Sequence, residues 1–128
     1  MLFHKNKKSK AELSQPEREA IIDLLHLCLY ADAHISLRES AVISDVIEVI
    51  GWDTKLSFSS YESRSIASAR AAKADEKLKK DFFEYASERL PSKASKELAV
   101  TLCGDLLSSD GTQEKEAILL SQIRAALK

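Results

Sequence analysis

Apolar residues recur every three or four positions along most of this chain, which is the period of a helix with one buried face. The first such stretch has its apolar positions at Ile21, Leu24, Leu25, Cys28 and Leu29. It follows Ser14-Gln15-Pro16-Glu17, where Ser14 can cap a helix, Pro16 fits its first turn and Glu17 completes a capping box. The pattern predicts a first helix that ends near residue 30.

A second start signal, Ser36-Leu37-Arg38-Glu39, precedes another set of helically spaced apolar residues. These are Val42, Ile43, Val46, Val49 and Ile50. Gly51 lies where the end of a helix favours a residue with positive φ, and Trp52 is expected to anchor the following segment on the core. A second helix is therefore predicted, joined to the first by a short polar loop.

The middle of the chain has a weaker pattern. A third helix is predicted from Ser59 to about Lys73, with Tyr61, Ile66 and Ala69 facing inward. A fourth is expected from Asp75 to Leu90, before the helix-breaking Pro91. Its inward residues are predicted to be Leu78, Phe82, Tyr85 and Ala86.

Two further helices are predicted on either side of Ser109-Asp110-Gly111-Thr112. Their inward residues are Leu98, Ala99, Leu102, Cys103, Leu106 and Leu107 in the first, and Leu119, Leu120, Ile123, Ala126 and Leu127 in the second. Because no stretch alternates as a strand would, the sequence predicts an all-α fold, a compact bundle of six or seven helices. The residues expected to be almost fully buried are Leu24, Leu25, Val46, Leu102, Leu106 and Ile123.

The chain has 128 residues, of which 45% are hydrophobic and 30% charged, as is typical of one globular domain. Residues 1–13 are rich in lysine and lack apolar periodicity, so they are predicted to be a flexible basic tail and residues 14–128 the single domain. Weak contact of this tail with an anionic membrane is an alternative. The net charge of −1 argues against nucleic acid as a partner. Without a signal peptide or a spanning stretch, a cytoplasmic location is expected.

No catalytic motif is found in the sequence, and the protein is expected not to be an enzyme. Cys28 and Cys103 lack a CxxC spacing and are interpreted as buried, reduced thiols. His26 is predicted at the rim of its helix. It lies two residues from Cys28, so the two side chains project from different faces and cannot form a nucleophile–base pair.

The first and last helix pairs form an internal repeat. When Asp32 is aligned with Asp110, the apolar positions of the flanking helices match, and after deletion of one residue in the second loop Glu39 aligns with Glu116. Any two amphipathic helix pairs can share their apolar spacing by chance. The matching acidic residues are less readily explained in this way. We therefore expect two helix-loop-helix hairpins related by a pseudo-twofold axis, with residues 20–50 superposing on residues 98–127.

The acidic loops of this repeat resemble those of the tellurite-resistance TerB family and its wider TerB-like superfamily. The resemblance rests on Ala31-Asp32-Ala33-His34-Ile35-Ser36-Leu37-Arg38-Glu39 and on Ser109-Asp110-Gly111-Thr112-Gln113-Glu114-Lys115-Glu116. Ala33 stands where the family has glycine, and the second loop is one residue shorter. The resemblance implies a compact all-α bundle and a role in tellurite or other chemical stress, with metal association and partner scaffolding as proposed activities.

The repeat supplies four candidate ligands of a divalent cation: Asp32, Glu39, Asp110 and Glu116. Hard cations prefer several carboxylate oxygens that converge on one point. The same residues also have a structural explanation, because Glu39 completes a capping box with Ser36 and aspartates favour turns. Both interpretations stay open at this point.

Asp32, His34, Asp110 and Thr112 form the candidate surface for a partner protein, at the loop ends of the hairpins. The sequence thus predicts a non-enzymatic TerB-like domain that binds a partner protein through its acidic loops, with a divalent cation as a possible ligand. The alternative is a purely structural helical scaffold or interaction domain without a metal site. No other cofactor is expected.

Overall fold

The computed structural model describes residues 13–29, 37–53, 55–108 and 114–128 of the chain. These residues form six α-helices: α2 (Gln15–Leu29), α3 (Leu37–Ile50), α4 (Phe58–Ala74), α5 (Glu76–Arg89), α6 (Lys93–Ser108) and α7 (Glu114–Ala126). No strand occurs in the described ranges, and the prediction of an all-α fold is confirmed.

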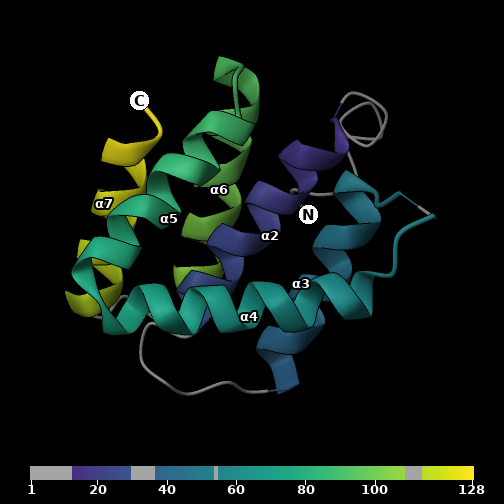
Figure 1. Ribbon diagram of the computed structural model, residues 1–128, viewed down its shortest axis with the longest axis horizontal. Helices are drawn as coiled ribbons and strands as arrows, with labels where there is room; N and C mark the ends of the chain where they lie inside the picture. Colours follow the sequence, from purple (N-terminus) through teal and green to yellow (C-terminus); the bar gives the residue numbers. More distant parts are fainter. Residues whose placement is uncertain (1–12, 30–36, 54, 109–113) are drawn as a thin grey trace.

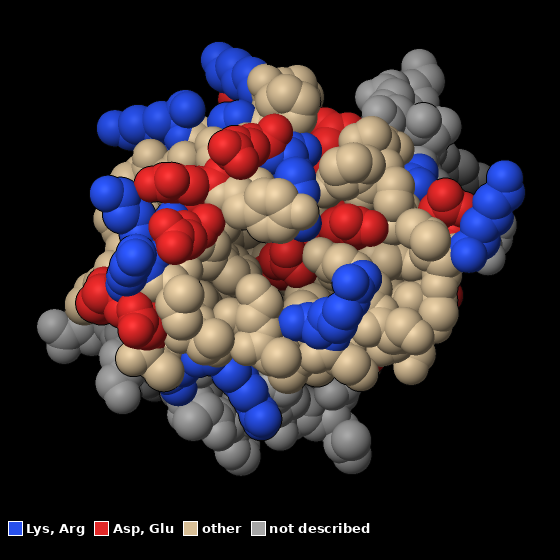
Figure 2. Space-filling model, viewed as in Figure 1, with Lys and Arg blue, Asp and Glu red and all other residues tan. Residues whose placement is uncertain are grey.

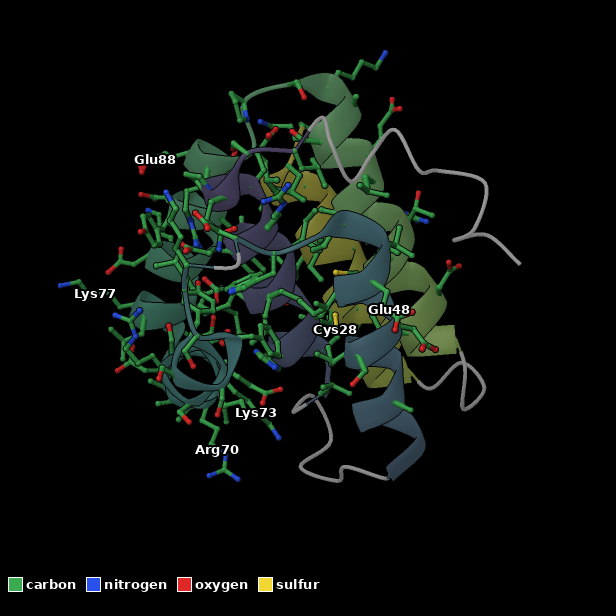
Figure 3. All side chains as sticks on the ribbon, turned by 90° about the vertical axis from the view of Figure 1, so that its right-hand side faces the viewer. Cys28, Glu48, Arg70, Lys73, Lys77 and Glu88 are labelled. Atoms are coloured by element: carbon green, nitrogen blue, oxygen red, sulfur yellow. The ribbon has the colours of Figure 1, made fainter. Side chains whose placement is uncertain are left out.

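α2 is the central helix of the bundle. It contacts α3, α4, α5 and α6, and Figure 3 shows it between the pair α4 and α5 on one side and α3 and α6 on the other. α4 also packs on α5, while α7 packs on α6 and α5 (Figure 1). Because α2 has neighbours on all sides, every residue from Ala20 to Leu29 is buried. None of the helices in the described ranges is both long and apolar enough to cross a membrane.

The ends of the helices follow the capping signals of the sequence. Ser14 and Glu17 form the predicted capping box, in which the Glu17 N–H donates to Ser14 Oγ (3.3 Å) and the Ser14 N–H donates to Glu17 Oε1 (2.8 Å). Gly51 ends α3 with a φ of 82°, and its N–H donates to the carbonyl oxygen of Ile47 (2.8 Å). The side chain of Asp75 caps α5. These local bonds satisfy backbone groups that the helices themselves leave unpaired.

The core contains the residues expected from the apolar pattern. All six residues predicted to be almost fully buried are at most 4% exposed: Leu24, Leu25, Val46, Leu102, Leu106 and Ile123. Cys28 and Cys103 are both buried and form no disulfide, as predicted. Trp52 also anchors as expected, edge-on to Phe58 with ring centroids 5.0 Å apart, and tilted against Tyr61 at 5.4 Å. Leu13, the last residue of the predicted tail, is partly buried against this core, whereas residues 1–12 lie outside the described residues.

The start of α4 differs by one residue from the prediction. The helix begins at Phe58 rather than Ser59, because Ser57 is its cap and its side chain accepts a hydrogen bond from the Ser60 N–H at 3.2 Å. Several serines follow one another here, and each could cap a helix. The sequence therefore predicts the helix but does not decide which serine caps it.

Two predictions of inward residues on α5 are wrong. Phe82 and Ala86 are buried as expected, but Leu78 is 46% exposed and Tyr85 is 58% exposed. The apolar stripe of α5 is wider than the surface that its neighbours cover, so the residues at its margin remain on the outside. His26 was predicted at the rim of its helix, and this is also wrong: its exposed fraction is 1%, because α2 is enclosed and has no rim.

Candidate functional site

The candidate residues of the acidic loops fall outside what the structure describes. Asp32, His34, Asp110 and Thr112 belong to the ranges that are not described. Glu39 and Glu116 lie in the first turns of α3 and α7, and their side chains are not described either. The predictions of a cation site and of a partner surface at these loops therefore stay predictions. Elsewhere in the described chain, no group of three or more His, Cys, Asp or Glu side chains could hold a metal ion.

A polar network centred on Asp23 lies inside the bundle. Its Oδ1 accepts hydrogen bonds from the hydroxyl groups of Tyr61 (2.8 Å) and Ser65 (2.6 Å), both on α4. Its Oδ2 accepts a hydrogen bond from Arg89 Nη2 at 2.7 Å, at the end of α5. The carboxylate is only 9% exposed and is satisfied by three donors, which offset the cost of removing it from water.

Arg89 is also held by further contacts, including a hydrogen bond from its Nε to the carbonyl oxygen of Tyr85 at 3.3 Å. Its guanidinium carbon lies 3.8 Å from the centre of the Tyr85 ring, and Nη1 donates to the hydroxyl oxygen of Tyr61 at 3.4 Å. Burial alone would lower the pKa of Arg89, but the charge of Asp23 and the bond to it outweigh this effect and raise it. Burial, and next the charge of Asp23, raise the pKa of Tyr61, so its hydroxyl keeps its proton and stays a donor.

His26 joins the network through Ser65. His26 Nδ1 lies 2.7 Å from Ser65 Oγ, and because the Ser65 hydroxyl donates to Asp23, the imidazole must donate its Nδ1–H to Ser65. Nε2 is then an unprotonated acceptor, and it is buried without a hydrogen-bond partner among the described residues. Burial lowers the pKa of His26 to about 4, against an opposing effect of the Asp23 charge, so the ring is neutral at pH 7.

This arrangement of serine, histidine and aspartate does not activate a nucleophile. In a catalytic triad the serine gives its proton to the imidazole, and the aspartate orients the other ring nitrogen. Here the serine hydroxyl donates to the aspartate and receives the imidazole N–H. The remaining nitrogen, Nε2, lies 3.7 Å from Glu62 Oε2 and is not directed at the serine. The network holds three helices together and offers no base to Ser65.

Above this network, a groove of about 500 Å³ runs between α4 and α5. Asp23 and Glu19 of α2 form its floor, and the α4 side includes Tyr61, Arg64 and Ser65. Figure 2 shows this face of the molecule, with acidic atoms at the bottom of the hollow near its centre. Arg64 lies over the ring of Tyr61 at 5.6 Å. The polar floor is thus ordered by its own bonds.

The α5 side of the groove is mainly apolar. Leu78, Phe82 and Tyr85 line it at helical spacing, and Leu78 and Tyr85 are two of the four large hydrophobic residues exposed in the described chain. Asp81, on the same side, adds a negative charge at the rim. The groove therefore combines an apolar wall with polar groups on its floor and rim, as is common at binding sites.

The sequence reasoning missed Asp23 and its partners. The available signal was Asp23 itself, a charged residue inside the most apolar run of the chain, Ala20 to Leu29. A helix that is apolar on every side is enclosed, and a charge within it needs an opposite charge nearby. The pattern could have predicted such a partner, but it could not identify Arg89 among 19 Lys and Arg residues.

Comparisons of the chain with known protein families, with curated proteins and with solved structures found no match.

Proposed function

We propose that this protein is a non-enzymatic helical interaction domain that binds an apolar segment of a partner protein in the groove between α4 and α5. The observation that carries the proposal is the exposure of Leu78 and Tyr85 on the wall of that groove. Both belong to the same apolar stripe of α5 as the buried Phe82 and Ala86. Large exposed hydrophobic side chains gathered at a groove are typical of protein interaction sites.

The chemistry of the floor favours binding over catalysis. Asp23 has a donor for each of its oxygens, and Arg89 and Ser65 are engaged with it. A general acid or base needs a proton that a substrate can reach, whereas His26 is 1% exposed and Tyr61 donates to Asp23. A docking site, in contrast, benefits from an ordered floor, because less conformational freedom is lost on binding.

The proposal includes the TerB-like duplication, with its association with chemical stress and a cytoplasmic location. Support for equivalent hairpins comes from burial at paired positions, since both members of seven aligned pairs are at most 5% exposed, although Ile43 is buried and its counterpart Leu120 is only partly buried. The pairs are Ile21 with Ala99, Leu24 with Leu102, Leu25 with Cys103, Cys28 with Leu106, Leu29 with Leu107, Val46 with Ile123, and Ile50 with Leu127. Because amphipathic helices of unrelated origin can share this spacing, the duplication of the hairpin is itself part of the proposal.

We also propose a second ligand of the domain, a divalent cation. It would be held by Asp32, Glu39, Asp110 and Glu116, on the grounds of their residue types and their alignment in the repeat. A purely structural role of these carboxylates is the alternative. The groove argument does not depend on the cation, because it rests only on described residues of α2, α4 and α5.

The test compares Leu78→Ser with the matched control Leu56→Ser. Both leucines are 46% exposed, but Leu56 lies before α4 and does not line the groove. The wild-type protein and the two variants are immobilised and exposed to an extract of the native cells. We expect a protein that is retained by the wild type and by Leu56→Ser and is lost with Leu78→Ser. If retention by the two variants is equal for every recovered protein, the scaffold alternative is favoured.

A further inference from the structure

A second groove lies at the end of the bundle where α6 begins and α7 ends. Figure 1 shows the first turn of α6 and the last turn of α7 at this same end. The groove has a volume of about 900 Å³. Of its described lining residues, four are basic, Lys93, Lys96, Arg124 and Lys128, and one is acidic, Glu97. This local excess of positive charge contrasts with the net charge of −1 of the whole chain.

Among the described residues, the bonds within the groove leave this charge largely uncompensated. Lys96 Nζ donates to the carbonyl oxygen of Leu90, and lies 3.4 Å from that of Ser87. These carbonyl groups hold the ammonium group in place without cancelling its charge. Lys93 and Glu97 are 4.0 Å apart with side chains 90% and 67% exposed. Solvent screens both charges of this exposed pair, so the net positive charge of the described groove comes mainly from Lys96, Arg124 and Lys128.

The groove also has apolar lining. Pro91 lies at its α6 end, Val100 is half-buried on α6, and Leu127 is 5% exposed after the last turn of α7. An apolar side chain could therefore enter between the basic groups, where it would be removed from water while carboxylates on either side remain at the rim.

We propose that the groove between the start of α6 and the end of α7 binds an acidic protein segment, with an apolar side chain flanked by carboxylates. Charge complementarity selects the acidic segment, and the apolar lining selects an occupant with apolar side chains. A nucleic acid presents its phosphate groups without such side chains. The wide surface of a bilayer does not fit a recessed groove between two helix ends. This site is separate from the groove between α4 and α5 and does not depend on the function proposed for it.

The test uses a labelled peptide with a central leucine between glutamates and measures binding by fluorescence anisotropy at low salt. The variant is the double substitution Lys93→Glu and Lys128→Glu. The control is Lys73→Glu and Lys77→Glu, which changes the net charge equally at exposed sites near the α4–α5 corner (Figure 3). We expect the first double variant to weaken binding about tenfold or more, and the control by about twofold or less, because close charges dominate over distant ones.

Two further binding measurements decide which class of ligand this groove binds. Replacing the leucine of the peptide by serine should weaken binding by about threefold or more, as expected when one apolar side chain leaves a partly buried site. An oligonucleotide and vesicles with anionic lipid should bind more weakly than the peptide. Equal losses in the two double variants, no effect of the leucine, or tighter binding of the oligonucleotide or the vesicles would each overturn the proposal. Circular dichroism of both double variants confirms that they are folded.

Discussion

Asp23 on α2 and Arg89 at the end of α5 form an ion pair inside the bundle, with Oδ2 and Nη2 2.7 Å apart and each side chain 9% exposed. The two residues are 66 positions apart in the sequence. Tyr61 and Ser65 of α4 donate to the other carboxylate oxygen. Three helices thus meet at one carboxylate, beneath the groove proposed to bind a partner.

The first prediction concerns this ion pair. Arg89→Met should lower the free energy of unfolding by about 3–5 kcal/mol, because it leaves the Asp23 carboxylate buried without a counter-charge. Adding Asp23→Asn should restore part of the loss, because the amide is neutral and can still accept from Ser65. Urea unfolding of the single and double variants measures both effects. A loss below about 1 kcal/mol for Arg89→Met would mean that the pair acts like an exposed one.

The second prediction is a pH dependence of stability due to His26. Burial lowers its pKa to about 4 in the folded protein, below the usual value of 6.5. Between these pH values the unfolded chain binds a proton that the folded protein does not, so the free energy of unfolding falls as the pH falls. The full effect is on the order of 3 kcal/mol.

Because carboxylates also titrate near pH 4, the measurement compares the wild type with His26→Gln. The glutamine amide can still donate to Ser65 but does not titrate. Denaturant unfolding between pH 7 and pH 4.5 should show a shallower decline for the variant. Parallel curves for the two proteins would contradict the assignment of a buried neutral imidazole.

The third prediction replaces two glycines by alanine, with opposite expected effects on the stability of the protein. Gly51→Ala should destabilise the protein by about 1–2 kcal/mol, because φ at this position is 82° and a Cβ is unfavourable there. Gly104→Ala should stabilise it by about 0.5–1 kcal/mol, because Gly104 lies inside α6 and its new Cβ would meet Leu120 only at 3.8 Å. Thermal unfolding of both variants measures the difference. Shifts of the same sign would contradict the backbone argument.

The helix pattern of this chain was predictable because its start and stop signals are local. The capping box of Ser14 and Glu17 and the positive φ of Gly51 depend only on nearby residues. Most core positions of α3, α6 and α7 were predictable for the same reason, since each of these helices has one buried face.

The candidate site was not predictable to the same extent, because it depends on which helices become neighbours. Leu78 and Tyr85 have the spacing of core residues, and only the width of the surface that covers α5 leaves them exposed. Similarly, His26 is interior only because α2 is enclosed. The pairing of Asp23 with Arg89 joins residues whose separation in the sequence gives no indication of contact.

The fourth prediction concerns the loop carboxylates. If Asp32 and Asp110 contribute to a cation site, the double substitution Asp32→Asn and Asp110→Asn should abolish binding of Ca²⁺ or Mg²⁺ in calorimetric titration. Asparagine can make similar turn bonds, so the melting temperature without cation should stay nearly unchanged. Equal heats for the wild type and the variant with every tested cation would favour the structural role of these loops.

The central claim is that a partner docks between α4 and α5, and photo-crosslinking at Tyr85 tests it most directly. p-Benzoylphenylalanine in place of Tyr85, which is 58% exposed in the groove, is compared with the same residue in place of Ile118, which is 53% exposed on α7 outside it. After irradiation in the native cells, we predict a discrete crosslinked protein with the probe at position 85 and its absence with the probe at position 118. Identical products at both positions, or none at position 85, would contradict the claim.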